Sequence, residues 1–177
     1  MNNLEWKQVP DVIPTPMPLI NMATLRAGLP RDGRLLGLDP GSKTIGLALT
    51  DVRLMLASPY GALPRRKLGQ NAAEIAAIAR KQGAAGLLVG LPLSMDGTLG
   101  PAAQAARDWT QALSDATGLP AALWDERLSS AAVNRMLIQE MDLTRKKRAA
   151  VVDGLAAAYT LQAALDASAA ARQSDHS

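Results

Sequence analysis

Short apolar runs bounded by turn residues predict strands at residues 34–39, 44–50, 53–62, 85–90 and 121–125. The first run ends at Pro40-Gly41, and only a short link separates it from the second, so these two strands should form an antiparallel hairpin. The run at 85–90 is apolar throughout, which is typical of a strand buried in a parallel sheet.

Apolar residues at helical spacing predict helices at 70–82, at 101–117, from Ser129 or Ser130 to about 141, and from Thr144 to 165. The elements therefore run as three strands, helix, strand, helix, strand and two helices. Early strands can pair through hairpins, whereas the later ones need helical crossovers. We expect an α/β fold with a five-stranded mixed sheet, three antiparallel strands followed by parallel ones, and helices on both faces.

The regions outside this pattern predict the domain limits. Residues 1–33 show no sustained periodicity and are rich in proline, which predicts a flexible extension in which Met22 is an alternative translation start. Residues 34–165 should form a single domain. Residues 166–177 should form a polar tail.

Missing residue types exclude several kinds of chemistry. The sequence has no cysteine and one histidine, His176, in the polar tail. Disulfides, thiolate zinc sites and thiol nucleophiles are excluded, and a Ser-His-Asp triad is almost excluded. An enzyme with this sequence should work with carboxylates, hydroxyls, Lys, Arg and a hard metal ion.

Hydropathy and charge bear on location and partners. No run of 18 apolar residues is present, and the N-terminus lacks the features of a signal peptide. We therefore expect a cytoplasmic protein that does not bind membranes. The formal net charge of +3 permits nucleic-acid binding without demonstrating it.

Three acidic residues on apolar elements are the sharpest chemical signal. Asp39 closes one apolar run, Glu126 follows another, and Asp153 is the only charge in 149–165. Ligands bind at the carboxyl ends of strands in α/β sheets, where Asp39 and Glu126 should lie close together if their strands flank 85–90. The last helix could add Asp153, and three carboxylates would bind one or two Mg²⁺ or Mn²⁺ ions.

Each of these features also has a structural explanation. Asp39 precedes Pro-Gly and could be a turn acid, Glu126 could pair with Arg127 at the surface, and Asp153 could lie at a helix terminus. The loop at 90–97 could be a plain turn. Basic clusters at 65–67 and 145–148 are solvated charges by default, although the second precedes Asp153 and could bind phosphates.

Four segments carry a family resemblance: GLDPGSKTIGLALTD, VGLPLSMDG, WDERLSS and VVDGLAAAYTLQ. They resemble the YqgF-type family of the ribonuclease H-like superfamily, described as Holliday junction resolvases and as pre-16S ribosomal RNA nucleases. The resemblance covers residues 34–165. It implies that Asp39, Glu126 and Asp153 are the catalytic residues that hold Mg²⁺ or Mn²⁺. Asp96 would contact substrate or orient its loop, and the remaining substrate-binding candidates are Lys43, Arg127, Arg145, Lys146, Lys147 and Arg148.

The implied reaction is two-metal hydrolysis of phosphodiester bonds in precursor 16S ribosomal RNA, in branched DNA such as a Holliday junction, or in both. The protein would act as a monomer or homodimer. One alternative is a ribosome-assembly factor that binds nucleic acid on the same fold without cutting it. Another is an ATPase of the actin and hexokinase kind, which needs about twice this length.

Overall fold

The strands form one sheet in the order β3-β2-β1-β4-β5. The structure is a computed structural model that describes residues 17–92, 96–126 and 145–174. For the part of the last helix up to Asp153, it describes only the backbone. The strands β1 to β3 pair antiparallel, and β4 and β5 add in parallel on the other side of β1. The predicted five-stranded mixed sheet is confirmed. The strands are β1 (Arg34–Pro40), β2 (Thr44–Thr50), β3 (Ala57–Pro64), β4 (Ala84–Leu91) and β5 (Ala121–Asp125).

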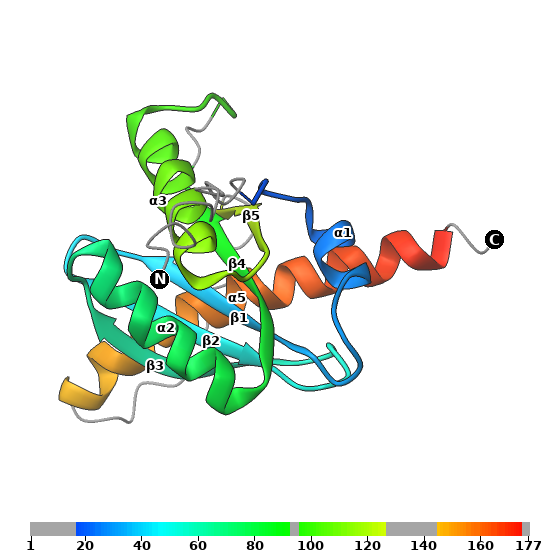
Figure 1. Cartoon of the computed structure of the whole chain (residues 1–177), viewed down its shortest axis with the longest axis horizontal. Coiled ribbons are helices and arrows are strands. Elements are labelled where there is room, and N and C mark those ends of the chain that lie inside the picture. Colours follow the sequence, from blue (N-terminus) through cyan, green and yellow to red (C-terminus); the bar gives the residue numbers. More distant parts are fainter. Residues whose placement is uncertain (1–16, 93–95, 127–144, 175–177) are drawn as a thin grey trace, which may run out of the picture.

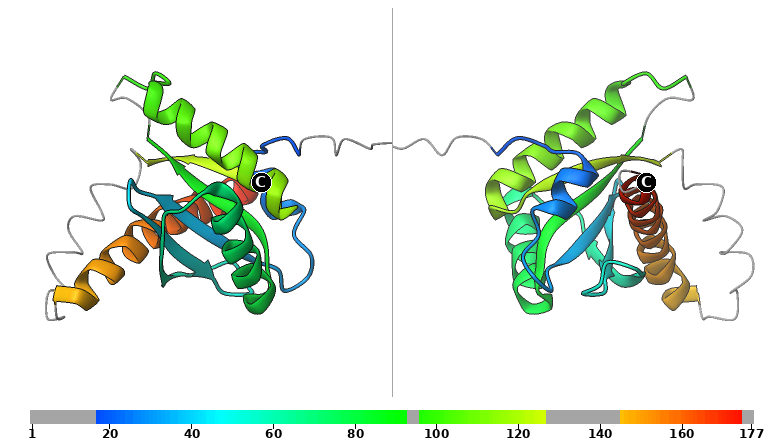
Figure 2. Two further views of the ribbon diagram at one scale, coloured as in Figure 1. Left: turned by 60° about the vertical axis from the view of Figure 1, so that its left-hand side comes forward. Right: turned by 90° about the vertical axis from the view of Figure 1, so that its right-hand side faces the viewer.

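Helices cover both faces of the sheet, as the element order predicted. Two helices, α2 (Leu68–Gln82) and α3 (Pro101–Thr117), lie on one face, and α5 (Arg145–Ser174) with the short α1 (Met22–Ala27) lies on the other (Figure 1). Figure 2 shows the sheet between α3 and α5. No helix within the described ranges has both the length and the apolar composition needed to span a bilayer.

The alternation of side chains along β1 assigns its residues to two separate cores. Leu36 and Leu38 pack with α2 and α3, whereas Leu35 packs with α1 and α5. Gly37 also faces α5, because a Cβ atom there would lie 3.1 Å from the Cβ of Leu161. Asp39, two residues further on, therefore lies on the α5 face of the sheet.

The segment before β1 is not the flexible extension that its prolines predicted, at least from residue 17 onward. Met22 and Leu25 of α1 are only 5% and 1% exposed, and Ile20 bridges in parallel to Ala122 at the edge of β5. A Cβ atom at Gly86 would lie 2.8 Å from Leu25, so the missing side chain on β4 makes room for α1. Residues 1–16 lie outside the described part.

Two further boundaries differ from the sequence predictions. The last helix continues beyond residue 165 to Ser174, through an alanine-rich segment with high helix propensity, so most of the expected polar tail is helical. Strand β3 begins at Ala57 rather than at 53, because the Asp51 carboxylate accepts hydrogen bonds from the backbone of Met55 and Leu56 and holds a turn. The helix expected at about 129–141 lies outside the described residues.

Candidate carboxylate site

Asp39 and Glu126 lie at the carboxyl ends of two strands that flank β4. The register pairs Leu38 with Val89 on one side of β4 and Asp125 with Leu91 on the other. Asp39 shares the α5 face with Gly37, and Glu126 continues the alternation of Ala122 and Trp124, which pack with the α5 core. The predicted approach of the two acids across the middle strand is therefore present.

Gly90 of β4 supplies the space between the two acids. A Cβ atom at this position would lie 2.5 Å from Oε1 of Glu126 and 2.8 Å from its Cγ. Any larger residue would therefore collide with the carboxylate. The glycine lets Glu126 lie over β4 within hydrogen-bonding reach of Asp39.

The close approach of Asp39 and Glu126 favours binding of a proton or a cation between the two carboxylates. The pKa of Glu126 is raised from its ordinary value of 4.5 to about 7. Burial is the largest cause, followed by the charge of Asp39, a hydrogen bond with Asp39 and the charge of Asp125. The protonated Glu126 carboxyl can donate to Asp39, so one proton offsets the repulsion. A cation bound by both carboxylates would offset it in the same way.

A pocket of about 310 Å³ opens beside these carboxylates. Asp39, Gly90 and Glu126 form one wall, and a stripe along α3 forms another, with small residues at helical spacing followed by an indole: Ala102, Ala105, Ala106 and Trp109. The turn between β1 and β2 and the side chain of Arg65 complete the lining. The pocket thus lies at the carboxyl edge of the sheet, where Asp39 and Glu126, whose side chains are on the α5 face, border the apolar α3 wall and a cation at the rim.

The third predicted acid is placed only by its backbone. Asp153 lies on α5, which packs on the Asp39 face of the sheet, and a Cβ atom on the adjacent Gly154 would lie 3.2 Å from Pro59 and 3.4 Å from the carbonyl oxygen of Leu47. The structure does not describe the side chain of Asp153, so its approach to Asp39 and Glu126 stays a prediction. Among the described side chains, no group of three or more acidic residues or histidines could hold a metal ion.

The predicted substrate-binding residues are placed unevenly. Lys43 is exposed in the turn between β1 and β2, beside the pocket-lining Ser42. Asp96 accepts hydrogen bonds from the backbone and hydroxyl of Thr98, and its role in contacting substrate or orienting the loop stays a prediction. Arg127 lies outside the described residues. The basic run Arg145, Lys146, Lys147 and Arg148 begins α5, where only the backbone is described.

Sequence reasoning missed Gly90, Arg65 and Trp109 as parts of the site. The Arg65 guanidinium donates to the carbonyl oxygen of Gly41 at 2.7 Å and lies 5.6 Å from the ring centroid of Trp109. Nothing in the sequence links these residues, because they come from separate elements. Gly90, which ends an apolar strand, is the one position whose pattern could have indicated a close approach.

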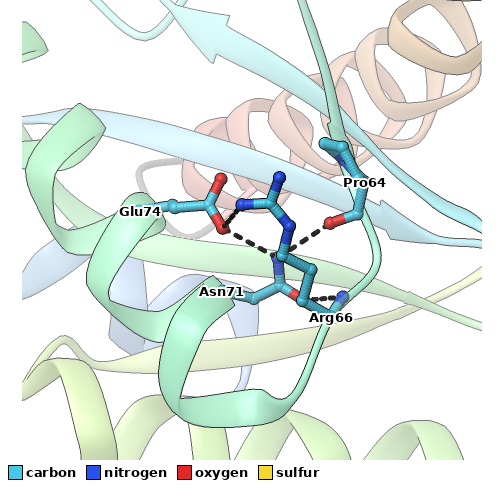
Figure 3. A network of polar contacts seen from close by, with 4 residues as sticks. All are labelled: Pro64, Arg66, Asn71 and Glu74. Atoms are coloured by element: carbon cyan, nitrogen blue, oxygen red, sulfur yellow. Dashed lines mark hydrogen bonds and ion pairs between the residues drawn. The ribbon is translucent and has the colours of Figure 1, made fainter.

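The neighbouring Arg66 is turned to a different partner. Its guanidinium pairs with Glu74 at 3.4 Å, and its backbone N–H donates to Asn71, which in turn donates to the carbonyl oxygen of Pro64 (Figure 3). Arg66 thus stabilises the start of α2. The expected solvated basic cluster therefore contains two arginines with different surroundings.

Comparisons with known proteins show which family the chain belongs to. A family model described as "RuvX: Holliday junction resolvase" matches residues 33–167. A protein of Gluconacetobacter diazotrophicus named "Putative pre-16S rRNA nuclease" is 69% identical over 86% of this chain and 99% of its own length. A protein of Gluconobacter oxydans with the same name is 66% identical over 86% of this chain and 95% of its own.

A solved structure supports the fold independently. Thermus thermophilus RuvC in complex with a Holliday junction substrate matches with a TM-score of 0.50 and 16% identity, over 80% of this chain and 96% of that one. At this identity the match shows a shared fold alone. With the family match over residues 33–167 and the high identity to full-length relatives, the chain belongs to the RuvX family of nucleases, and the YqgF-type resemblance is confirmed.

Proposed function

We propose that this protein is a metal-dependent endonuclease that hydrolyses phosphodiester bonds in structured nucleic acid. The observation that carries the proposal is the carboxylate pair Asp39–Glu126 at the wall of an open pocket. The names of the relatives favour 5′ maturation of precursor 16S ribosomal RNA, and the family description favours Holliday junction resolution. Either substrate places an anionic backbone at the pocket. The expected cytoplasmic location suits a ribosomal RNA precursor.

The donor set fits a hard divalent cation. Asp39 and Glu126 offer carboxylate oxygens, which Mg²⁺ and Mn²⁺ prefer, and their repulsion without a cation provides a driving force for binding one. Asp153 is the expected third ligand. When bound, the metal would supply charge neutralisation at the phosphate and a water of lowered pKa.

The chain's own residues prepare the pocket for this chemistry. Gly90 leaves room for Glu126, which can take up or release a proton near neutral pH. The alanines and Trp109 of α3 form a weakly polar wall, which strengthens electrostatic interactions inside the recess. Such a site can hold a phosphate between the carboxylates and the cationic rim formed by Arg65.

The deciding experiment compares cleavage of a precursor 16S ribosomal RNA fragment and a four-way DNA junction, each in Mg²⁺, Mn²⁺ and EDTA. We expect cleavage of at least one substrate with metal and none in EDTA. Glu126→Gln should abolish it, while Glu74→Gln, a carboxylate on α2 that pairs with Arg66, should not. Tight binding without cleavage under all conditions would instead favour the non-catalytic ribosome-assembly factor.

A further inference from the structure

Arg65 stands at the rim of the carboxylate pocket, and none of the described carboxylates compensates its charge. Its backbone N–H donates to the carbonyl oxygen of Lys43 at 2.8 Å, and its side chain donates to Gly41 at 2.7 Å. Within the described part of the chain, no carboxylate forms an ion pair with it. One N–H donor is therefore engaged, and the rest of the guanidinium fork is available to a ligand in the pocket.

Trp109 is the aromatic neighbour of that guanidinium. The centre of the guanidinium lies 5.6 Å from the indole centroid, within the range of a cation–π interaction. Trp109 is itself half-buried and packs against the core beneath α3, so its ring can hold the Arg65 guanidinium in place. The carbonyl oxygen of Gly41 and the indole therefore orient Arg65 from two separate elements.

A nucleic acid that binds at this pocket needs a positively charged side chain beside the two carboxylates. A nucleic-acid backbone that approaches Asp39 and Glu126 meets two carboxylates, which repel it. Arg65 borders the same pocket from the α3 side of this edge and can offset that repulsion by binding a phosphate. Arginine suits this role because its planar fork matches two oxygens of one phosphate.

We propose that Arg65 binds a backbone phosphate of the nucleic-acid strand held in this pocket, next to the bond that is cut, and that Trp109 is the positioning residue for its guanidinium. This inference rests on the proposed nuclease function. Neither residue was singled out as a substrate contact by the sequence. Arg66, one position away but paired with Glu74, provides a matched control.

The test measures binding of the full-length protein to the precursor 16S ribosomal RNA fragment in EDTA over a series of salt concentrations. Arg65→Gln should weaken binding roughly tenfold or more and reduce the slope of log K against log salt by about 0.7 to 0.9, the loss of one phosphate contact. Arg66→Gln removes the same charge and should leave the slope near that of the wild type. An equal reduction in both variants would overturn the proposal, because it would reflect only the net charge of this face.

A double-mutant cycle tests the positioning role. Trp109→Leu should weaken binding roughly threefold to tenfold, and Trp109→Phe, which keeps an aromatic face, should retain most of the affinity. If Trp109 acts through Arg65, adding Trp109→Leu to Arg65→Gln should cause no further loss. A full additional loss in the double variant would show that Trp109 acts independently and would overturn its assignment.

The outcomes separate this proposal from the proposed function. A wild-type protein that binds neither the RNA fragment nor the DNA junction would overturn both. Wild-type binding with an unchanged salt slope in Arg65→Gln would overturn the Arg65 proposal alone. A lowered melting temperature with that unchanged slope would identify Arg65 as a support for the turn at Gly41.

Discussion

The carboxylate of Glu126 occupies the space that a side chain at Gly90 would fill, since a Cβ atom there would lie 2.5 Å from Oε1. Gly90→Ala should therefore push the carboxylate away from Asp39. Because the colliding atom is the end of a flexible side chain, the melting temperature should change little. Cleavage should fall by about a hundredfold, since a displacement of about 1 Å at a reacting centre can cost that much.

A glycine without close neighbours provides the control for this substitution. Gly69 lies in α2, where a Cβ atom would meet no other atom within 4 Å, and its backbone angles are ordinary. Gly69→Ala should keep full activity and a melting temperature at or above that of the wild type. Gly90→Ala with full activity would show that the position of Glu126 is unimportant.

The raised pKa of Glu126 predicts how stability without metal depends on pH. Between its ordinary value of 4.5 and its value of about 7, the folded protein binds more protons at this group than the unfolded chain does. The contribution of this group to the free energy of unfolding should therefore fall as pH rises through this window and level off above it. Urea unfolding in EDTA from pH 4.5 to 8 measures the effect.

Two variants separate the causes of that pH dependence. Glu126→Gln removes the ionisable group, so the decline between pH 4.5 and 7 should flatten. Asp39→Asn keeps the burial of Glu126 but removes the neighbouring charge, so a smaller decline should remain. An unaltered decline in Glu126→Gln would assign it to another group.

The sequence predicted the sheet well because each strand carries its own signal. The apolar composition of the runs at 34–39 and 85–90 indicates that these strands are buried. The helical crossovers between the strands restrict the order in which they can pair. The approach of Asp39 and Glu126 followed from that order. The pocket wall did not, because Arg65 and Trp109 meet only through the packing of α3 against the end of the sheet.

The N-terminal segment shows a different limit of sequence reasoning. Its prolines suggested flexibility, but α1 is short and its stability comes from the tertiary contacts of Met22 and Leu25, which no local pattern reveals. The partner that makes room for Leu25 is Gly86, far along the chain. A sequence pattern confined to neighbouring residues could not have predicted this contact between Leu25 and Gly86.

Leu25→Ala tests whether this segment is part of the folded domain. The side chain is 1% exposed, so the variant should lose about 2 to 4 kcal/mol of unfolding free energy. Thr24→Ala changes an exposed position of the same helix and should have little effect. Denaturant unfolding of both variants checks this, and equal stability in Leu25→Ala would restore the view of a flexible extension.

Asp153 should affect metal binding and not stability. It is the only charge in 149–165, on the helix that packs against the Asp39 face of the sheet. Asp153→Asn keeps the shape and removes a charge that would repel the other two carboxylates. The metal-free protein should then melt at the wild-type temperature or higher, as measured by a thermal scan in EDTA.

With metal present, the same variant should behave very differently. Thermal stabilisation by added Mg²⁺ or Mn²⁺ should shrink, because that gain follows metal affinity. Cleavage should fall on the order of a hundredfold or more, since a lost ligand weakens the hold on an ion that the transition state needs. A clear drop in metal-free melting temperature would mark Asp153 as a structural acid, and full activity would remove it from the site. If both effects of metal are reduced while metal-free stability is kept, Asp153 joins Asp39 and Glu126 as the third ligand.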